Sequence, residues 1–503
     1  MRRRMTTAVA VAAVATVSLG STAQAAPTTL DTGFSGDGVL PLLSTTNENL
    51  TNLEVLPNGK VMVVTLTGDE PAIEVRRLRA NGTPDPTFGG GDGMIGLALG
   101  ASYEDLALTV DPKSGKTYVS TFLDGGSFPS TVWRLTADGS LDLPYGGGTG
   151  HVVFNQRLVS DIKALPGGKL VMSGTDFSTN DASVWRLRNN GTPDATFGSG
   201  GQVVLAAATT TDTVARLAVQ PDGKIVAAGS RYDPTASKLL VFRLKANGAL
   251  DPSFSGDGRA TINPSSTTVT TSTVWDPALL IRPDGRLALV AGLNQHDTAY
   301  FNSLLVAGLT KAGKPDQKLR KRVLTSVTSF SADAVLERDG KILASGALSS
   351  STSTGVVLRL NAKGTLDTSW SGDGVLGWSG HGSPNGIGIA ASGRVLVGST
   401  DYTPTPITSE IRALKGTRTP RCHGKLATQF GSGKADRIVG TAGPDVLVGL
   451  GGGDVLDGKG GNDVLCGNAG KDLLKGGPGN DYLNGGPGKD TLRGGSGRNT
   501  LVP

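Results

Sequence analysis

Aspartate returns at every ninth residue near the C-terminal end of this chain. The series consists of Asp436, Asp445, Asp454, Asp463, Asp472, Asp481 and Asp490, and Asn499 holds the next place. One aliphatic residue stands two places after each member, from Ile438 to Leu501, and glycines crowd the residues before it. A flexible Gly-rich linker has no reason to keep aspartate and leucine in phase through eight units, so the spacing predicts an ordered repeat.

The repeat also predicts a geometry and a shortage of stabilising energy. Six turn residues and three strand residues form half a coil, so Asp445 stacks on Asp463 and Asp454 on Asp472, about 4.8 Å apart. Two unit charges at that spacing repel by ~1 kcal/mol in water. One buried leucine contributes ~1.5–3 kcal/mol, whereas ordering nine backbone residues costs roughly 9–18 kcal/mol. Carboxylate and carbonyl oxygens that converge in Gly-rich turns suit calcium, which would supply part of the difference.

The unit resembles the RTX, or haemolysin-type, nonapeptide Gly-Gly-x-Gly-x-Asp-x-aliphatic-x, most clearly at residues 476–481 and 485–490. This resemblance implies a calcium-binding parallel β-roll over residues 431–503, with Ca²⁺ as the cofactor. The metal-ligating residues that it implies are Asp445, Asp454, Asp463, Asp472, Asp481 and Asp490. Lys434 stands where a glycine belongs and Asn499 replaces an aspartate, so the two ends should bind more weakly than the centre. The eight Asp of this segment are balanced by eight Lys or Arg, which predicts weaker affinity than in a strongly acidic roll.

Residues 1–25 are expected to be a secretory signal peptide. An n-region of three arginines, Arg2 to Arg4, precedes an apolar core from Ala8 to Leu19 and a small-residue cleavage site at residues 23–25. The apolar core is short for a membrane span, so we expect a secreted, extracellular protein with no membrane span after signal cleavage. A net charge of +5 diluted over 503 residues argues against a nucleic-acid partner.

Cys422 and Cys466 are the two cysteines of the chain, and we expect them to form a disulfide. Export favours oxidation, and Cys466 directly follows the inward Leu465, so it faces out of the roll. Closing 45 residues would stabilise the fold by roughly 4 kcal/mol on the chain-entropy model. The alternative is two unrelated thiols. Two Cys and four His leave little material for a transition-metal site.

From residue 30 to about residue 415 the chain repeats itself with a period near 56, and three sequence elements recur seven times each. The first pairs an acidic residue with an aromatic one, as in residues 30–38 and 193–197. The second is a turn between apolar runs, such as Pro-Asn-Gly-Lys at residues 57–60. The third is a strand that ends near Arg-Leu, as at residues 77–78. These elements resemble the delta-60 repeat, a secreted bacterial module usually taken as β-propeller-like.

The repeat predicts an all-β fold. Asn-Gly and Asp-Gly loops mark hairpins, and short apolar runs mark buried strands. Four strands per repeat predict a seven-bladed β-propeller over residues 26–415, followed by a linker at 416–430 and the C-terminal parallel β-roll. Residues 39–42 should close the ring by pairing beside residues 408–414, because closure removes two exposed edges. An open β-solenoid is the alternative.

The propeller repeats carry no catalytic signature of their own. Turn chemistry explains the Asp-Gly pairs, and His151, His296 and His381 share no metal-ligand spacing. One core aromatic per blade explains the series Phe34, Phe88, Phe197, Phe254 and Trp370. We therefore expect a non-enzymatic, secreted calcium-binding protein whose propeller is a binding or structural surface, with a cell-surface polymer or an extracellular protein as its partner.

The rival hypothesis is a secreted propeller enzyme that acts on an extracellular small molecule or glycan. A propeller can gather catalytic residues from different blades in its central channel, and one sequence does not reveal them. Carboxylates or histidines around the axis would favour this rival. A channel lined by serine, threonine and aliphatic residues would exclude it.

Overall fold

A computed structural model describes residues 30–503 with short gaps, and the expected leader and Lys434 lie outside the described residues. The gaps are 43–47, 68–71, 99–102, 124–128, 207–211, 232–236, 265–271, 275–276, 296–300, 320–321, 326–328, 349–353, 371–372, 380–382, 402–406, 416–419 and 432–434. The described chain is all-β, with two 3-10 turns, η1 (Gly89–Gly91) and η2 (Pro166–Gly168). None of its helices has the length and apolarity of a membrane span.

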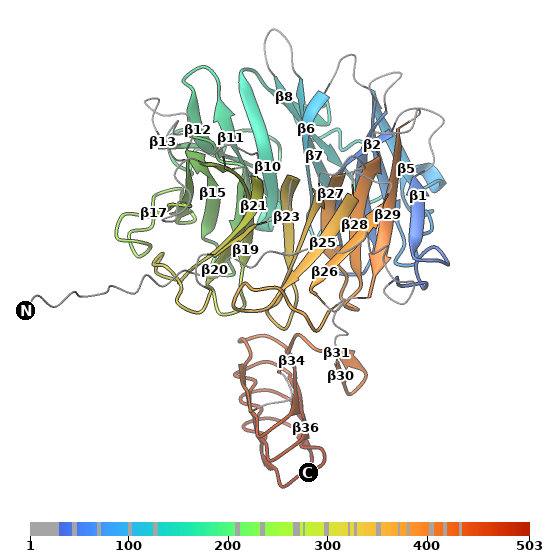
Figure 1. Ribbon diagram of the computed structural model, residues 1–503, viewed down its shortest axis with the longest axis vertical. Coiled ribbons are helices and arrows are strands. Elements are labelled where there is room, and N and C mark those ends of the chain that lie inside the picture. Colours follow the sequence, from blue (N-terminus) through green and yellow to red (C-terminus); the bar gives the residue numbers. More distant parts are fainter. Residues whose placement is uncertain are drawn as a thin grey trace, which may run out of the picture.

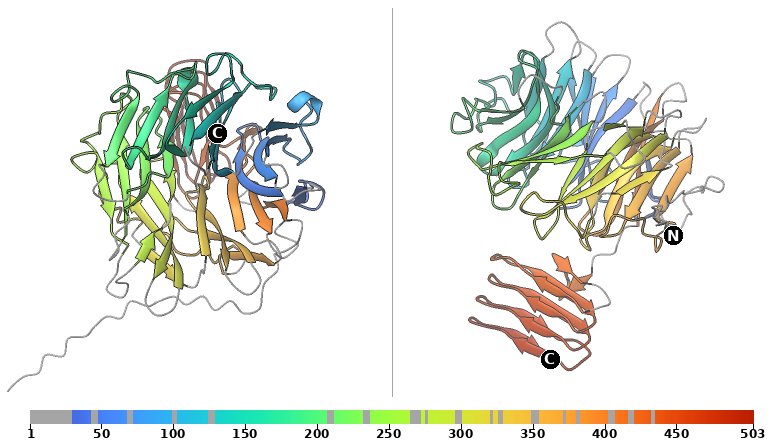
Figure 2. Two further views of the ribbon diagram at one scale, coloured as in Figure 1. Left: turned by 90° about the horizontal axis from the view of Figure 1, so that it is seen from above. Right: turned by 60° about the vertical axis from the view of Figure 1, so that its left-hand side comes forward.

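Seven antiparallel sheets stand around a common axis as the blades of a propeller (Figure 1, Figure 2). Blades 1 to 3 consist of β2 (Glu48–Val55), β3 (Val61–Thr67), β4 (Ala72–Leu78), β5 (Met94–Ala98); β6 (Tyr103–Val110), β7 (Thr117–Leu123), β8 (Ser130–Leu135), β9 (His151–Phe154); and β10 (Arg157–Leu165), β11 (Lys169–Asp176), β12 (Asp181–Leu187), β13 (Gln202–Ala206). The predicted seven-bladed propeller is therefore confirmed.

Blades 4 to 7 repeat the arrangement, with the first strand of each blade innermost. They consist of β14 (Arg216–Val219), β15 (Ile225–Arg231), β16 (Lys238–Leu244), β17 (Arg259–Ile262); β18 (Ser272–Val274), β19 (Ala278–Ile281), β20 (Leu287–Gln295), β21 (Phe301–Leu309), β22 (Arg322–Thr325); β23 (Ser329–Leu336), β24 (Ile342–Leu348), β25 (Thr354–Leu360), β26 (Val375–Ser379); and β27 (Ser383–Ile389), β28 (Val395–Asp401), β29 (Thr408–Leu414), β1 (Val39–Leu42). In blade 5 the inner edge is split, because both β18 and β19 pair with β20.

The first strand of the chain completes the last blade. Strand β1 pairs antiparallel with β29, so that Val39 lies opposite Arg412 and Leu42 opposite Ser409. The main chain of Asp31 adds a hydrogen bond of 2.8 Å from its N–H to the Ala413 carbonyl oxygen. This is the closure predicted from the sequence, and it rules out an open solenoid for residues 30–414.

The three recurring sequence elements meet in one cluster per blade. In blade 3, Asp194 Oδ2 pairs with Arg186 Nε at 2.9 Å and with Lys169 Nζ at 2.8 Å. The Arg186 guanidinium lies 4.6 Å from the centroid of the buried Phe197 ring, and its Nη1 donates to the Ala246 carbonyl oxygen of the next blade. The cluster therefore joins hairpin, aromatic core and neighbouring blade through one carboxylate.

The same cluster recurs around the ring with small variations. Its carboxylates and their guanidinium or ammonium partners are Asp85 with Arg77 and Lys60, Asp142 with Arg134 and Lys116, Asp251 with Arg243 and Lys224, Asp316 with Arg286, Asp367 with Arg359 and Lys341, and Asp31 with Arg394. Burial by itself would raise the pKa of Asp194. The hydrogen bonds from Lys169 and Thr196 and the nearby charge of Arg186 outweigh burial and hold the pKa well below its usual range. The expected core aromatics are buried in these clusters.

Replacing Asp194 by Ala should destabilise the propeller by about 3–5 kcal/mol, because Arg186 would keep a buried charge without its partner. The matched control is Asp222→Ala, since Asp222 also pairs with a lysine but its side chain is 55% exposed, against 2% for Asp194. That control should lose less than about 1 kcal/mol. Urea unfolding followed by tryptophan fluorescence measures both losses. Equal losses from the two substitutions would contradict the role given to the cluster.

The C-terminal segment forms a parallel β-roll whose coils are eighteen residues long. One sheet consists of β32 (Gln429–Phe430), β34 (Val446–Gly451), β36 (Val464–Ala469), β38 (Tyr482–Asn484) and β40 (Thr500–Val502), and the other of β33 (Arg437–Val439), β35 (Val455–Asp457), β37 (Leu473–Lys475) and β39 (Thr491–Arg493). Partner residues are eighteen apart, as in Leu447 with Leu465. The aliphatic series from Ile438 to Leu483 fills the interior and is at most 7% exposed. The expected β-roll is confirmed.

A disulfide joins Cys422 to Cys466, the pairing expected from the sequence. Cys422 belongs to a short hairpin of β30 (Arg421–Cys422) and β31 (Lys425–Leu426) that lies on the outer face of the roll. There it covers Val446, Val448 and Val464, and the His423 ring stacks on Tyr482 at 4.1 Å between centroids. The bridge thus holds a small second core outside the leucine interior.

Candidate metal centre and central channel

The repeating aspartates form two stacked rows along the roll. One row consists of Asp436, Asp454, Asp472 and Asp490, and the other of Asp445, Asp463 and Asp481, continued by Asn499. In each row the main-chain N–H of one aspartate donates to Oδ1 of the residue eighteen places later, for instance from Asp454 to Asp472 at 2.7 Å. One carboxylate oxygen of each pair is therefore used to hold consecutive coils together.

The other oxygen is left open in most units. Within the described residues, Oδ2 is buried and has no hydrogen-bond partner in Asp454, Asp463, Asp472, Asp481 and Asp490. Asp445 differs, because its Oδ2 accepts from the Thr441 N–H at 2.6 Å and from the Thr441 hydroxyl at 2.9 Å. Buried unpaired carboxylate oxygens are costly and rare in folded proteins, so five in register are typical of a cation-binding site.

Each open oxygen points into a small cradle beside a glycine. A methyl group built on Gly449 would fall 2.7 Å from the Gly467 carbonyl oxygen and closer still to Asp454 Oδ2. Gly458, Gly467 and Gly476 repeat this arrangement one unit later each time. The cradle therefore brings carboxylate and carbonyl oxygens from two consecutive coils to one point, which is the donor set that calcium prefers.

The candidate sites rely on main-chain oxygens as much as on side chains. In the part of the chain that the structure describes, no group of three or more His, Cys, Asp or Glu residues has metal-binding geometry. The sequence predicted that carbonyl oxygens of the Gly-rich turns would join the aspartates, but it did not say which glycines supply them. The signal was present, because Gly449, Gly458, Gly467 and Gly476 precede their aspartates by five residues without exception.

The carboxyl groups of the roll carry the electrostatic mark of this crowding. Burial, together with the stacked carboxyls of Asp481 and Asp445, outweighs the bond from the Asp445 N–H and raises the pKa of Asp463 to about 6. Burial and stacked neighbours raise the pKa of Asp454 and Asp472 in the same direction. A cation in the cradles would relieve both effects.

Two family models match the two parts of this architecture. Residues 430–465 and 467–501 match the RTX calcium-binding nonapeptide repeat. The C-terminal segment consists of RTX repeats. Residues 56–88, 166–197, 220–254 and 337–369 match a β-propeller domain of unknown function, DUF5122, so the N-terminal region contains that domain. No curated protein matches the chain.

Solved propellers are similar to the chain in fold at low sequence identity. A periplasmic gluconolactonase from Pseudomonas aeruginosa is 16% identical with a TM-score of 0.43, over 63% of this chain and 83% of the other. An α-L-arabinanase from Penicillium chrysogenum is 12% identical with a TM-score of 0.40, over 62% and 93%. A polysaccharide lyase described as an ulvan lyase is 10% identical with a TM-score of 0.41, over 75% and 96%. Likeness at this level bears on neither substrate nor activity.

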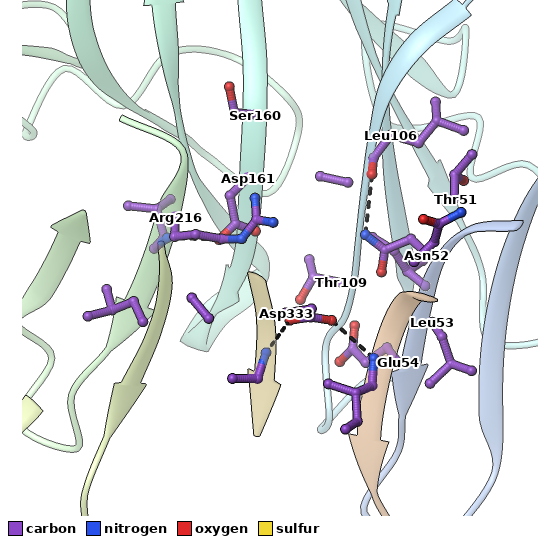
Figure 3. A pocket seen from close by; sticks show the side chains of 18 of the residues that line it. Thr51, Asn52, Leu53, Glu54, Leu106, Thr109, Ser160, Asp161, Arg216 and Asp333 are labelled. Atoms are coloured by element: carbon purple, nitrogen blue, oxygen red, sulfur yellow. Dashed lines mark hydrogen bonds between the residues drawn. The ribbon is translucent and has the colours of Figure 1, made fainter. Parts of the chain in front are cut away.

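The axis of the propeller holds a cavity of about 740 Å³ whose walls come from all seven blades. Its charged lining residues are Glu54, Asp161, Lys163, Arg216 and Asp333. Figure 3 labels Glu54, Asp161, Arg216 and Asp333. The channel is thus not limited to serine, threonine and aliphatic residues, and the carboxylates around the axis are the feature named above as favouring the rival hypothesis. The sequence did not point to these residues, because they lie on the innermost strands of different blades with no motif around them.

Replacing Gly467 by Ala should raise the calcium concentration needed to order the roll by tenfold or more, because the new methyl would occupy the cradle between Asp472 Oδ2 and the Gly485 carbonyl oxygen. The matched control is Gly460→Ala, since a methyl at Gly460 meets nothing closer than 3.8 Å. Hydrogen exchange of peptides from residues 440–501, followed by mass spectrometry during a calcium titration, measures the midpoint. A Gly460→Ala shift as large as that of Gly467→Ala would count against the cradle.

In excess chelator, the roll should be more protected at pH 4.5 than at pH 7.5. The pKa of Asp463 is raised to about 6 in the folded roll, so the folded state binds more protons than the unfolded chain between its ordinary pKa and pH 6. This stabilisation is fully present at low pH and is lost as the pH rises through about 6. Hydrogen exchange corrected for intrinsic rates at each pH tests the sign. Protection that increases with pH in chelator would refute it.

Proposed function

We propose that the protein is secreted, that calcium binding orders its C-terminal roll, and that its propeller serves as a binding surface. The observation that carries the proposal is the register of buried, unpartnered Oδ2 atoms with carbonyl oxygens of the next coil. The proposed ligand set is Asp454, Asp463, Asp472, Asp481 and Asp490, with Asp445 as a further ligand once Thr441 releases it. Bound calcium would supply the positive charge that the stacked carboxylates lack.

The coupling of binding to folding follows from the composition of the roll. The glycines of an unfolded roll offer no preformed site, so the free energy of binding is also free energy of folding. The interior supplies one aliphatic side chain per nine residues, and each carboxylate is stacked on another. Both facts favour an apo roll that is loosely ordered or unfolded.

The disulfide on the outer face of the roll supports export to an oxidising compartment. Disulfides persist in oxidising compartments, and Cys422–Cys466 lies on the outer face of the roll. The RTX repeats, the disulfide and the expected leader support an extracellular location, where calcium is abundant enough for a site of moderate affinity. The proposed partner of the propeller is a cell-surface polymer or another extracellular protein.

An extracellular propeller enzyme acting on a small molecule or a glycan is the second candidate. The observation that favours it is the charged lining of the central channel, since Glu54 there has a pKa raised to about 7 by burial and faces Lys163 and Asp161. A carboxyl that titrates near neutral pH is able to exchange protons with a bound molecule.

At pH 7.5, replacing Asp472 by Ala should raise the calcium midpoint for ordering the roll by about tenfold or more, since a charged ligand in the middle of its row is lost. Asp436→Ala is the matched control at the end of the same row, and it should shift the midpoint far less. Hydrogen exchange of the full-length protein during a calcium titration decides it. A roll already protected in excess chelator at this pH, or equal shifts from the two substitutions, would overturn the proposal.

A further inference from the structure

The central channel has one equivalent position in every blade. In each blade a hairpin turn follows the innermost strand. The first residue of this turn bonds across it, as the Leu56 N–H does to the Lys60 carbonyl oxygen and the Gln220 N–H to the Lys224 carbonyl oxygen. Four places before it, the innermost strand carries one residue per blade around the ring: Asn52, Ala107, Asp161, Arg216, Ala278, Asp333 and Gly386. Three of the seven are Ala or Gly, and the other four carry polar side chains.

Several polar residues of the channel serve to join neighbouring blades. Asp161 Oδ2 accepts from the Leu217 N–H of blade 4 at 2.8 Å, and its Oδ1 accepts from Lys163 Nζ at 2.6 Å. Asp333 Oδ2 accepts from the Ile387 N–H of blade 7 at 3.1 Å. Asn52 donates to the Leu106 carbonyl oxygen of blade 2 at 3.2 Å. These contacts give Asp161, Asp333 and Asn52 a structural role.

Arg216 has no such role. Its only hydrogen bond among the described residues runs from Nη1 to the carbonyl oxygen of the preceding Ala215, at 3.1 Å, and no described carboxylate lies within 4 Å of it. The guanidinium projects into the cavity from β14 (Figure 3). Most of its donors are therefore free for a ligand, in the planar fork that matches a carboxylate.

Glu54 lies across the cavity from Arg216, on β2, with Asp333 between them (Figure 3). Thr51, Asn52 and Thr109 line the cavity on the same side as Glu54. This wall offers hydroxyl, amide and carboxyl groups to the hydroxyl groups of a ligand.

We propose that the central channel binds a small hydroxylated carboxylic acid of the sugar-acid class, with its carboxylate on Arg216 and its hydroxyls on the wall of Glu54. A cavity of about 740 Å³ is within the range of small-molecule sites. Among the described lining residues, Lys163 is bonded to Asp161, Arg216 is the one cation without a carboxylate within 4 Å, and three carboxylates line the same cavity, so a singly charged ligand fits better than a dianionic phosphate. This inference rests on the proposed use of the propeller as a binding surface.

The protonation of Glu54 gives the site a distinct pH dependence. The groups that face it are Lys163 and Asp161 on β10, Arg216 on β14 and Asp333 on β23. Burial raises the pKa of Glu54 to about 7, so at higher pH the negative charge of Glu54 is added to those that already face the bound acid. Affinity should fall as the pH rises through about 7. Burial also raises the pKa of Asp333, and the Glu54→Gln variant separates the two groups because it abolishes only the first titration.

Isothermal titration of the full-length protein with glucuronate, at saturating calcium, tests the proposal. Glucuronate should bind with a Kd of about 1 mM or tighter, and neutral glucose should bind at least tenfold more weakly. Arg216→Gln should weaken glucuronate by roughly 10- to 100-fold, because a charge-assisted bond is lost. Arg259→Gln, at an exposed arginine of the outer strand β17, is the matched control and should change nothing. Glu54→Gln should keep binding and flatten its pH profile.

The outcomes separate this inference from the calcium proposal. No binding up to about 20 mM glucuronate, equal binding of glucose, or unchanged binding by a folded Arg216→Gln variant would each overturn the channel site. Thermal melting shows whether the Arg216→Gln variant is folded. Arg216→Lys is a second variant, which keeps the positive charge but loses the planar guanidinium that matches a carboxylate. A roll that ignores calcium while glucuronate binds would overturn the calcium proposal alone.

Discussion

Buried aspartate is the constraint on which both parts of the molecule depend, and each part meets it differently. In the propeller, Asp194 and its equivalents are bonded by an arginine and usually a lysine of the same blade, so the protein supplies the compensating charge. In the roll, Asp463 and its equivalents are stacked on other carboxylates, and one oxygen of each is open. The pKa values move in opposite directions accordingly, below the usual range for Asp194 and up to about 6 for Asp463.

This contrast separates a self-sufficient part from a conditional one. Each blade carries its own carboxylate cluster, and in five blades the arginine of the cluster donates to a carbonyl oxygen of the next blade, so these carboxylates need no ion from outside. The roll has a leucine interior and a small outer core fixed by Cys422–Cys466, yet its carboxylates still lack partners. Its order should therefore follow the ion content of the surroundings while the propeller stays folded.

The sequence predicted the parts of the structure that depend on regular spacing. Asp and Leu at a fixed interval of nine specify the coil length, the stacked rows and the inward face, so the roll was predicted almost residue by residue. The hairpin turns and the core aromatics predicted the blades for the same reason. The channel was not predictable, because Arg216 and Glu54 come to line one cavity only when the ring of blades has formed, and no motif surrounds either residue in the sequence. Nor did the pattern show that Thr441 bonds to Asp445, since this contact depends on one turn conformation.

Closure of the last blade by β1 has a consequence for the order in which the chain folds. The partner of residues 39–42 lies at residues 409–412, so the first strand to be synthesised has no place to pair until almost the whole propeller exists. Until that pairing forms, β1 is unpaired and β29, once it has been made, has a free edge, and contacts this distant in sequence form slowly. The end of the chain that appears first is therefore the last to be fixed, and the ring forms as a unit only after β29 has been made.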